Sequence, residues 1–275
     1  MGGFVSSAAM TPRRFERNAR LFGHEAVERL ARSHVIIFGL GGVGSWAAEG
    51  LARAGVGALT LVDFDKICAT NVNRQAPATM DAIGAFKADV MLERLRRINP
   101  AGSFEAVREF YREENAEELL PAAGGVDFVV DAIDNVKAKM HLLARCLSLK
   151  LPVISSMGAS GRLDPTKVRV SDLFDTHTDQ FAKDVRKFLR LKHGVPATTE
   201  RLGILAVWST ERPREPFEAE CEEECRRCAD CASGRNEFHS ADRRRQIGGS
   251  AGFVTGVFGM MAAGVVARRL AGLDG

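Results

Sequence analysis

The sequence predicts an α/β fold: a Rossmann-like, mostly parallel and doubly wound sheet. Three observations support this prediction. Short apolar runs alternate along the chain with helical patterns, a glycine-rich turn joins the first apolar run to the first long helix, and the second run ends on an acidic residue. Uninterrupted apolar runs are typical of strands buried on both faces, and their alternation with helices indicates a parallel sheet.

Composition is that of a soluble globular protein. The chain has 275 residues, 45% hydrophobic and 27% charged, with a formal net charge of +3. This mild basicity is compatible with a nucleic-acid partner but does not single one out. Residues 1–12 carry no signal-peptide pattern, and six cysteines without such a signal indicate a reducing compartment, so we expect a cytoplasmic protein.

The first strand and the turn after it form the clearest motif. Residues 35–38 are an apolar run, and Gly39, Gly41 and Gly44 follow at G-x-G-x-x-G spacing before a helical pattern over 46–54. In such a turn the first glycine permits the tight bend, the second lets the backbone approach a phosphate, and the third lets the helix pack closely on the strand. A helix N-terminus also favours an anion.

The second strand completes a βαβ unit. It is predicted over 58–62 and ends at Asp63, near the spacing at which a carboxylate accepts hydrogen bonds from a ribose. Strand, turn, helix and acid in this register predict a nucleotide site. Structural glycines without a ligand are the alternative.

The remaining elements follow in order. We expect a lead helix pair over 13–32, helices over 82–98, 113–120, 136–150 and 179–193, and strands over 103–110, 126–132, 152–156, 168–170 and 204–209. Residues 211–246 read as a flexible, cysteine-bearing crossover, and 247–270 as a glycine-rich helix. That helix is expected to pack on the core; membrane association is the alternative. We predict one domain, 1–275, with a nucleotide-binding core over 35–135 and a substrate-side half over 152–210.

Polar residues gather at the predicted carboxyl edge of the sheet, where ligands bind in such folds. A polar stretch containing Asn73 and Arg74 follows Asp63, Lys87 lies near the start of the next helix, and D-A-I-D-N, which begins at Asp131, ends the fourth strand. Two cations and a carboxylate suited to Mg²⁺ exceed the needs of a dinucleotide and suit a triphosphate attacked at its α-phosphorus. The alternative is two surface cations and a helix-capping carboxylate.

Several motifs, taken in order, resemble the adenylation domain of the ThiF/MoeB/E1-like family over about residues 13–160: G-x-G-G-V-G-S, L-V-D-F-D, N-V-N-R-Q, R-I-N-P and D-A-I-D-N. The resemblance implies an E1-like domain that adenylates a carboxylate with Mg-ATP. It implies that Asp131 serves Mg²⁺ and that Arg17 enters the ATP site of a partner subunit in a homodimer. The catalytic residues implied are Arg74, Lys87, Asp131 and Arg17, and the ATP-binding residues are Gly39, Gly41, Gly42, Gly44, Asp63, Asp65, Asn71, Asn73, Arg74, Gln75, Lys87, Asp131, Asp134 and Asn135.

The second half resembles one branch of that family, the tRNA threonylcarbamoyladenosine dehydratases. The motifs are P-V-I-S-S-M-G-A (152–159), L-D-P-T-K-V-R-V (163–170) and D-L-F-D-T-H-T-D (172–179). The resemblance implies ATP-dependent cyclisation of N6-threonylcarbamoyladenosine beside the tRNA anticodon, through an adenylated threonyl carboxylate. The basic helix after these motifs suits an RNA backbone; a solvated face is its alternative.

The cysteines depart from the family pattern. Relatives that activate sulfur-carrier proteins hold zinc with two separated C-x-x-C pairs, whereas this chain has Cys221, Cys225, Cys228 and Cys231 within eleven residues. Four thiolates suit zinc or an iron–sulfur cluster, but so short a loop favours reduced or redox-active thiols. Cys231, in C-A-S-G, resembles a sulfur-accepting position, which would imply a cysteine desulfurase as partner.

Three other functions remain open. An adenylyltransferase for a ubiquitin-like sulfur-carrier protein shares the first chemical step, but the missing C-x-x-C pairs and the 152–193 motifs disfavour it. A nicotinamide oxidoreductase rests only on the glycine turn and Asp63. A non-catalytic tRNA- or protein-binding module leaves Arg74, Lys87 and Asp131 unexplained.

Overall fold

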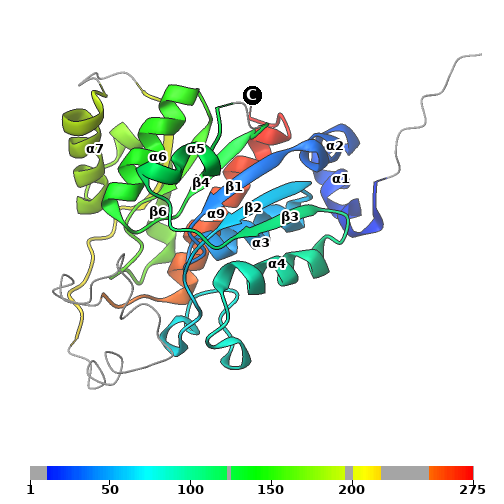
Figure 1. Ribbon diagram of the computed structural model, residues 1–275, viewed down its shortest axis with the longest axis horizontal. Helices are drawn as coiled ribbons and strands as arrows, with labels where there is room; N and C mark the ends of the chain where they lie inside the picture. Colours follow the sequence, from blue (N-terminus) through cyan, green and yellow to red (C-terminus); the bar gives the residue numbers. More distant parts are fainter. Residues whose placement is uncertain (1–10, 123–124, 196–200, 218–247, 275) are drawn as a thin grey trace, which may run out of the picture.

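One seven-stranded sheet forms the centre of the computed structural model, which describes residues 11–122, 125–195, 201–217 and 248–274 (Figure 1). Its strand order is β3-β2-β1-β4-β5-β7-β6, parallel except for β6, which pairs antiparallel with β7. The strands are β1 (His34–Phe38), β2 (Ala58–Val62), β3 (Ser103–Val107), β4 (Phe128–Asp131), β5 (Val153–Ser156), β6 (Val168–Asp172) and β7 (Ile204–Ser209). The predicted doubly wound fold is confirmed, and both predicted halves contribute strands to the sheet.

The direction of winding reverses between β1 and β4, which is where such sheets bind ligands. Phe38, the last residue of β1, pairs with Val62 of β2 on one side and with Asp131 of β4 on the other. The segments that leave these three strands therefore start side by side at one edge of the sheet.

Helices cover both faces of the sheet (Figure 1). Alternate residues of β1 point to opposite sides: Val35 and Ile37 pack with α3, α4 and α9, whereas Ile36 and Phe38 pack with α5, α6 and α7. The helices are α1 (Glu16–Phe22), α2 (His24–Arg32), α3 (Gly44–Ala54), α4 (Lys87–Ile98), α5 (Ala116–Leu119), α6 (Val136–Leu149), α7 (Gln180–His193) and α9 (Gly252–Leu270).

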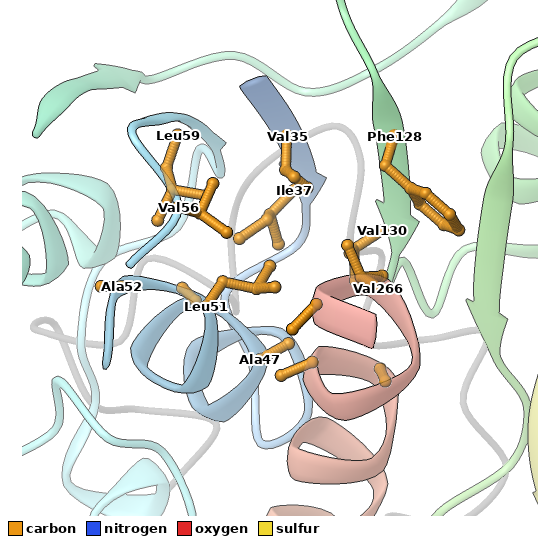
Figure 2. Packing of buried hydrophobic residues seen from close by; sticks show 14 of the residues in the cluster. Val35, Ile37, Ala47, Leu51, Ala52, Val56, Leu59, Phe128, Val130 and Val266 are labelled. Carbon is orange, nitrogen blue, oxygen red and sulfur yellow. The ribbon is translucent and has the colours of Figure 1, made fainter. Parts of the chain in front are cut away.

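The glycine-rich helix α9 packs against α3 and the sheet, with Leu51, Ala47 and Val266 meeting in one cluster (Figure 2). A Cβ atom on Gly50 of α3 would lie 2.7 Å from the Cβ of Ala263, so the small residues set the close approach of the two helices. Within the described part of the chain, α9 is the one helix long and apolar enough to cross a membrane, but half of its apolar window is buried inside the protein. Packing accounts for its composition.

Some predicted boundaries are wrong. The helix predicted over 82–98 begins only at Lys87, because Gly84 has a φ of +87° and Phe86 is extended. The strand predicted over 103–110 ends at Val107, and the predicted 168–170 strand continues to Asp172 because it pairs with β7 along its length. Residues 211–217 are irregular, and the rest of the predicted crossover lies outside the described residues.

Candidate nucleotide-binding site

The glycine turn combines close packing with one open position. Gly39 has a φ of +89°, and a Cβ there would lie 2.8 Å from the backbone oxygen of Ala132; a Cβ on Gly44 would overlap the carbonyl oxygen of Gly39. Among the residues that the structure describes, apart from its chain neighbours, none comes within 4 Å of the position that a Cβ on Gly41 would take. The first and third glycines are thus required by the fold, whereas the second leaves the backbone accessible, as an approaching phosphate requires.

Asp63 lies directly beside this turn and is 7% exposed. Its Oδ2 accepts a hydrogen bond of 2.6 Å from the Leu40 N–H, and its Oδ1 accepts one of 2.8 Å from the Asp65 N–H. Burial raises the pKa of Asp63, and the positive charge of Lys87 partly offsets the rise. These bonds fix the carboxylate and leave it lone pairs for a ribose hydroxyl.

Lys87, the first residue of α4, is buried at the same edge. Its Nζ donates to Asp65 Oδ2 at 2.8 Å. Burial lowers the pKa of Lys87, but the carboxylates of Asp63 and Asp65 outweigh it and the net shift is upward. The lysine is therefore a fixed positive charge next to the carboxylates of Asp63 and Asp65.

The polar loop after β2 brings a second cation. Arg74 donates from Nη1 to the backbone oxygen of Thr70 at 2.8 Å and to Asn73 Oδ1 at 2.9 Å. Burial lowers the pKa of Arg74, and Asp134 counteracts this. A Cβ on Gly42 would lie 3.2 Å from the Arg74 side chain, which therefore adjoins the glycine turn.

The neighbours of Arg74 shape this loop. Asn71 Oδ1 accepts from the Cys68 N–H at 3.1 Å, and the Asn73 side chain donates to the Ser250 carbonyl at 2.9 Å, which ties the loop to the start of α9. Gln75 is buried, and its Oε1 has no hydrogen-bond partner among the described residues.

The structure does not favour Asp131 as the metal carboxylate. Its side chain is fully buried, and its Oδ2 accepts from Lys139 Nζ and from Ser155 Oγ, both at 2.6 Å. Asp134, three residues later, is exposed, and its charge acts on both Arg74 and Lys87. Asn135 caps α6 by accepting from the Ala138 N–H at 3.1 Å. Of the two carboxylates in the D-A-I-D-N motif, Asp134 is thus the exposed one.

Arg17 is not part of this group within its own chain. It is exposed on α1, next to Asn18, whose side chain donates to the carbonyls of Arg53 and Ala54 at the far end of α3. The glycine turn begins that helix, and 11 residues of α-helix span about 16 Å. Within its own chain, Arg17 therefore lies at the end of α3 away from the glycine turn.

An open, largely apolar pocket of about 490 Å³ adjoins Arg74. Trp46, Val72, Phe253 and Met260 line it, and the last three are 38%, 61% and 50% exposed.

The substrate-side half adds a buried arginine that sequence reasoning missed. Arg162, in the loop after β5, donates from Nη2 to Asp179 Oδ2 at 2.9 Å; both side chains are buried, and Arg162 Nε has no partner among the described residues. The G-R-L-D-P-T stretch carries no periodic pattern that would have identified it. The basic helix forms as α7, and its exposed cations are Lys183, Lys187, Arg190 and Lys192.

The predicted cysteine cluster, Cys221, Cys225, Cys228 and Cys231, lies outside the described residues. In the described ranges no group of three or more histidine, cysteine, aspartate or glutamate side chains is placed to hold a metal ion. Cys146 is buried, and desolvation together with the charge of Asp131 raises its pKa to about 12, so its thiol is inert.

Comparison with known proteins gives one family and one group of relatives. The model of the ThiF family matches residues 15–274. The tRNA threonylcarbamoyladenosine dehydratase of Escherichia coli (strain K12) is 43% identical over 199 residues, which are 72% of this chain and 74% of that protein. The molybdopterin-synthase adenylyltransferase of the same strain is 37% identical over 145 residues, which are 53% of this chain and 56% of that protein.

A solved structure extends the likeness to almost the whole chain. The crystal structure of the E. coli tRNA N6-threonylcarbamoyladenosine dehydratase in complex with ATP is 36% identical and superimposes with a TM-score of 0.80, covering 95% of this chain and 96% of that chain. The likeness therefore includes the substrate-side half as well as the nucleotide edge.

Proposed function

The chain belongs to the ThiF family, and we propose that within it the protein is an ATP-dependent tRNA threonylcarbamoyladenosine dehydratase. It activates the threonyl carboxylate of N6-threonylcarbamoyladenosine beside the tRNA anticodon and converts the nucleoside to its cyclic form. The observation that carries the proposal is the likeness to the ATP-bound dehydratase over 95% of this chain. By sequence, the likeness to the E. coli dehydratase covers 72% of this chain, whereas that to the molybdopterin-synthase adenylyltransferase covers 53%.

We infer the position of ATP from the edge of the sheet. The open backbone at Gly41 and the N-terminus of α3 face the phosphates, and the fixed carboxylate of Asp63 accepts from the ribose hydroxyls. Lys87 and Arg74 supply positive charge where the pyrophosphate leaves, and they stabilise the transition state as negative charge builds there.

Mg²⁺ fits this edge through Asp134. Magnesium in such sites is bound by one or two carboxylates together with the substrate's phosphates and water, so a single exposed carboxylate suffices. Asp134 is exposed and acts electrostatically on both cations, whereas the oxygens of Asp131 are engaged inside the protein. When bound, the ion would neutralise phosphate charge during adenylation.

The reaction needs little chemistry from side chains after activation. The threonyl carboxylate attacks the α-phosphorus and pyrophosphate leaves; the neighbouring carbamoyl group then attacks the acyl carbon and AMP leaves, for a net loss of one water. Ring closure is intramolecular, so holding the nucleoside in position supplies much of the rate. β5 adjoins β4 on the side away from β1 and β2, and we assign Arg162, in the loop after β5, to the substrate side of the nucleotide.

We further propose a homodimer with Arg17 acting in trans, because Arg17 is exposed and remote from its own ATP site. The exposed apolar pocket beside Arg74 suits a protein partner at that position. The tRNA backbone would lie along the cations of α7. A cytoplasmic location follows from this substrate, and the packing of α9 requires no membrane. A metal cluster, a sulfur-accepting Cys231 and a desulfurase partner rest on the sequence alone.

The test is isotope exchange between pyrophosphate and ATP. We expect the purified protein to catalyse exchange with tRNA that carries threonylcarbamoyladenosine, and not with the same tRNA that lacks the modification. Exchange driven by a small sulfur-carrier protein while modified tRNA is inert would replace this proposal with the carrier-activating alternative.

A further inference from the structure

A fully buried lysine lies beneath the carboxyl edge of the sheet, outside the group of residues that face the nucleotide. Lys139, on the first turn of α6, has an exposed fraction of 0%. Its Nζ donates to Asp131 Oδ2 at 2.6 Å, to Ser155 Oγ at 3.0 Å and to the Ser156 carbonyl at 3.0 Å. All three donors of the ammonium group thus have acceptors, and these lie at the ends of two neighbouring strands, β4 and β5.

Asp131 also contacts the turn that follows β4. Its Oδ1 accepts a hydrogen bond of 3.1 Å from the Ile133 N–H. At the other end of the turn, the Lys139 N–H donates to the Asn135 carbonyl at 2.9 Å. The Asp131 carboxylate thus holds the start of the 132–135 turn, α6 begins at its end, and Asp134 lies within this turn.

Stability alone does not explain such a pair. Removing two charges from water is costly, and buried ion pairs can often be replaced by apolar residues of similar volume without loss of stability. The pair instead fixes the local geometry, because an ammonium group with three fixed acceptors allows only one arrangement of the strand ends and of the turn that follows β4.

We propose that Lys139 is a positioning residue, which acts through Asp131 to hold the 132–135 turn so that Asp134 meets the metal–phosphate group of the nucleotide. This rests on the proposed function only in assigning Mg-ATP to Asp134. Lys139 touches neither nucleotide nor substrate, and it sets the place of a carboxylate that does.

The experiment compares three variants with wild type. Lys139→Met removes the ammonium group and leaves the Asp131 carboxylate without its counter-charge. Lys139→Met combined with Asp131→Asn removes both charges, and Leu143→Ala is the control. Leu143 lies one turn further along α6, is also fully buried and carries no polar contact, so its variant reports the effect of a general loss of packing. Stability is measured by urea unfolding, and ATP binding by calorimetry with and without Mg²⁺, in the absence of tRNA.

We expect Lys139→Met to unfold more easily and the paired variant to recover stability. Both should bind ATP without Mg²⁺ about as well as wild type, because Asp63 and the glycine turn are intact. In both, the gain in affinity that Mg²⁺ brings should fall about tenfold, and Leu143→Ala should keep the wild-type gain.

A paired variant with the wild-type response to Mg²⁺ would overturn the proposal, as would a Leu143→Ala variant with the same defect. If Lys139→Met fails to fold, the paired variant alone decides. Wild type that binds Mg-ATP but ignores modified tRNA would reject the substrate assignment and leave this inference standing, whereas wild type that binds no ATP would reject both.

Discussion

Substituting alanine at two positions of one glycine turn should have opposite consequences. At Gly39 the φ of +89° disfavours any L side chain, and an added Cβ would lie 2.8 Å from the backbone oxygen of Ala132, directly after the neighbouring strand β4. At Gly41 an added Cβ meets no atom of the other described residues within 4 Å, and φ lies outside the positive region. The substitution at Gly41 should therefore affect ligand binding and not the stability of the fold.

The magnitudes follow from these geometries. Gly39→Ala combines a left-handed backbone, worth about 1–2 kcal/mol, with overpacking against a backbone atom, worth about 1–3 kcal/mol, so the free energy of unfolding should fall by about 2–5 kcal/mol. Gly41→Ala should change it by less than about 0.5 kcal/mol. If phosphate approaches the backbone here, its ATP dissociation constant should rise at least about tenfold, or about 1.4 kcal/mol.

The assay is urea unfolding of both variants, followed by calorimetric titration of Gly41→Ala with Mg-ATP. Wild-type ATP affinity in Gly41→Ala would refute the placement of the phosphates at the glycine turn. A large loss of stability in that variant would show that the open position is filled by the protein itself.

Four further outcomes are expected. Asp134→Asn should lower the rate of pyrophosphate exchange more than a hundredfold and leave the free energy of unfolding almost unchanged. Asp131→Asn should instead lower the free energy of unfolding, because it removes the buried charged partner of Lys139. Exchange kinetics and urea unfolding measure both effects. Because burial raises the pKa of Asp63, its carboxylate takes up a proton at a higher pH than usual, so ATP affinity should fall on acidification, and calorimetry on Asp63→Asn should lack that step. An Arg17→Ala protein mixed with a Lys87→Ala protein should regain part of the exchange activity that each lacks alone; no recovery would reject the action in trans. With its pKa raised to about 12, Cys146 should resist iodoacetamide at pH 8 in the native protein and react after unfolding, as peptide mass mapping will reveal.

Local patterns predicted the fold well where they coincide with tertiary pairing. The apolar runs that became β1, β2 and β4 were placed within two residues, because strands buried on both faces leave an uninterrupted apolar signal. The parallel order then implied that the glycine turn and Asp63 share one edge, and the register of Phe38 with Val62 confirms it. The start of α4 was harder to predict from sequence, because Gly84 and the extended Phe86 interrupt a pattern that is otherwise helical.

Side-chain direction was the main limit at the site. Asp131 and Asp134 belong to one acidic motif, and spacing alone does not say which carboxylate turns inward; the answer depends on Lys139 and Ser155, which lie 8 and 24 residues further along. Arg162 was missed because its partner, Asp179, starts a different element. A clue existed for Lys139, since a lysine among the buried residues Ala138, Met140 and Leu142 must find partners inside the protein.

The most direct test of the central claim is mass spectrometry of nucleosides from tRNA incubated with the purified protein and Mg-ATP. The account predicts that N6-threonylcarbamoyladenosine loses one water to become its cyclic form, with one AMP and one pyrophosphate released for each nucleoside converted. Unchanged nucleoside in the presence of bound ATP would contradict it.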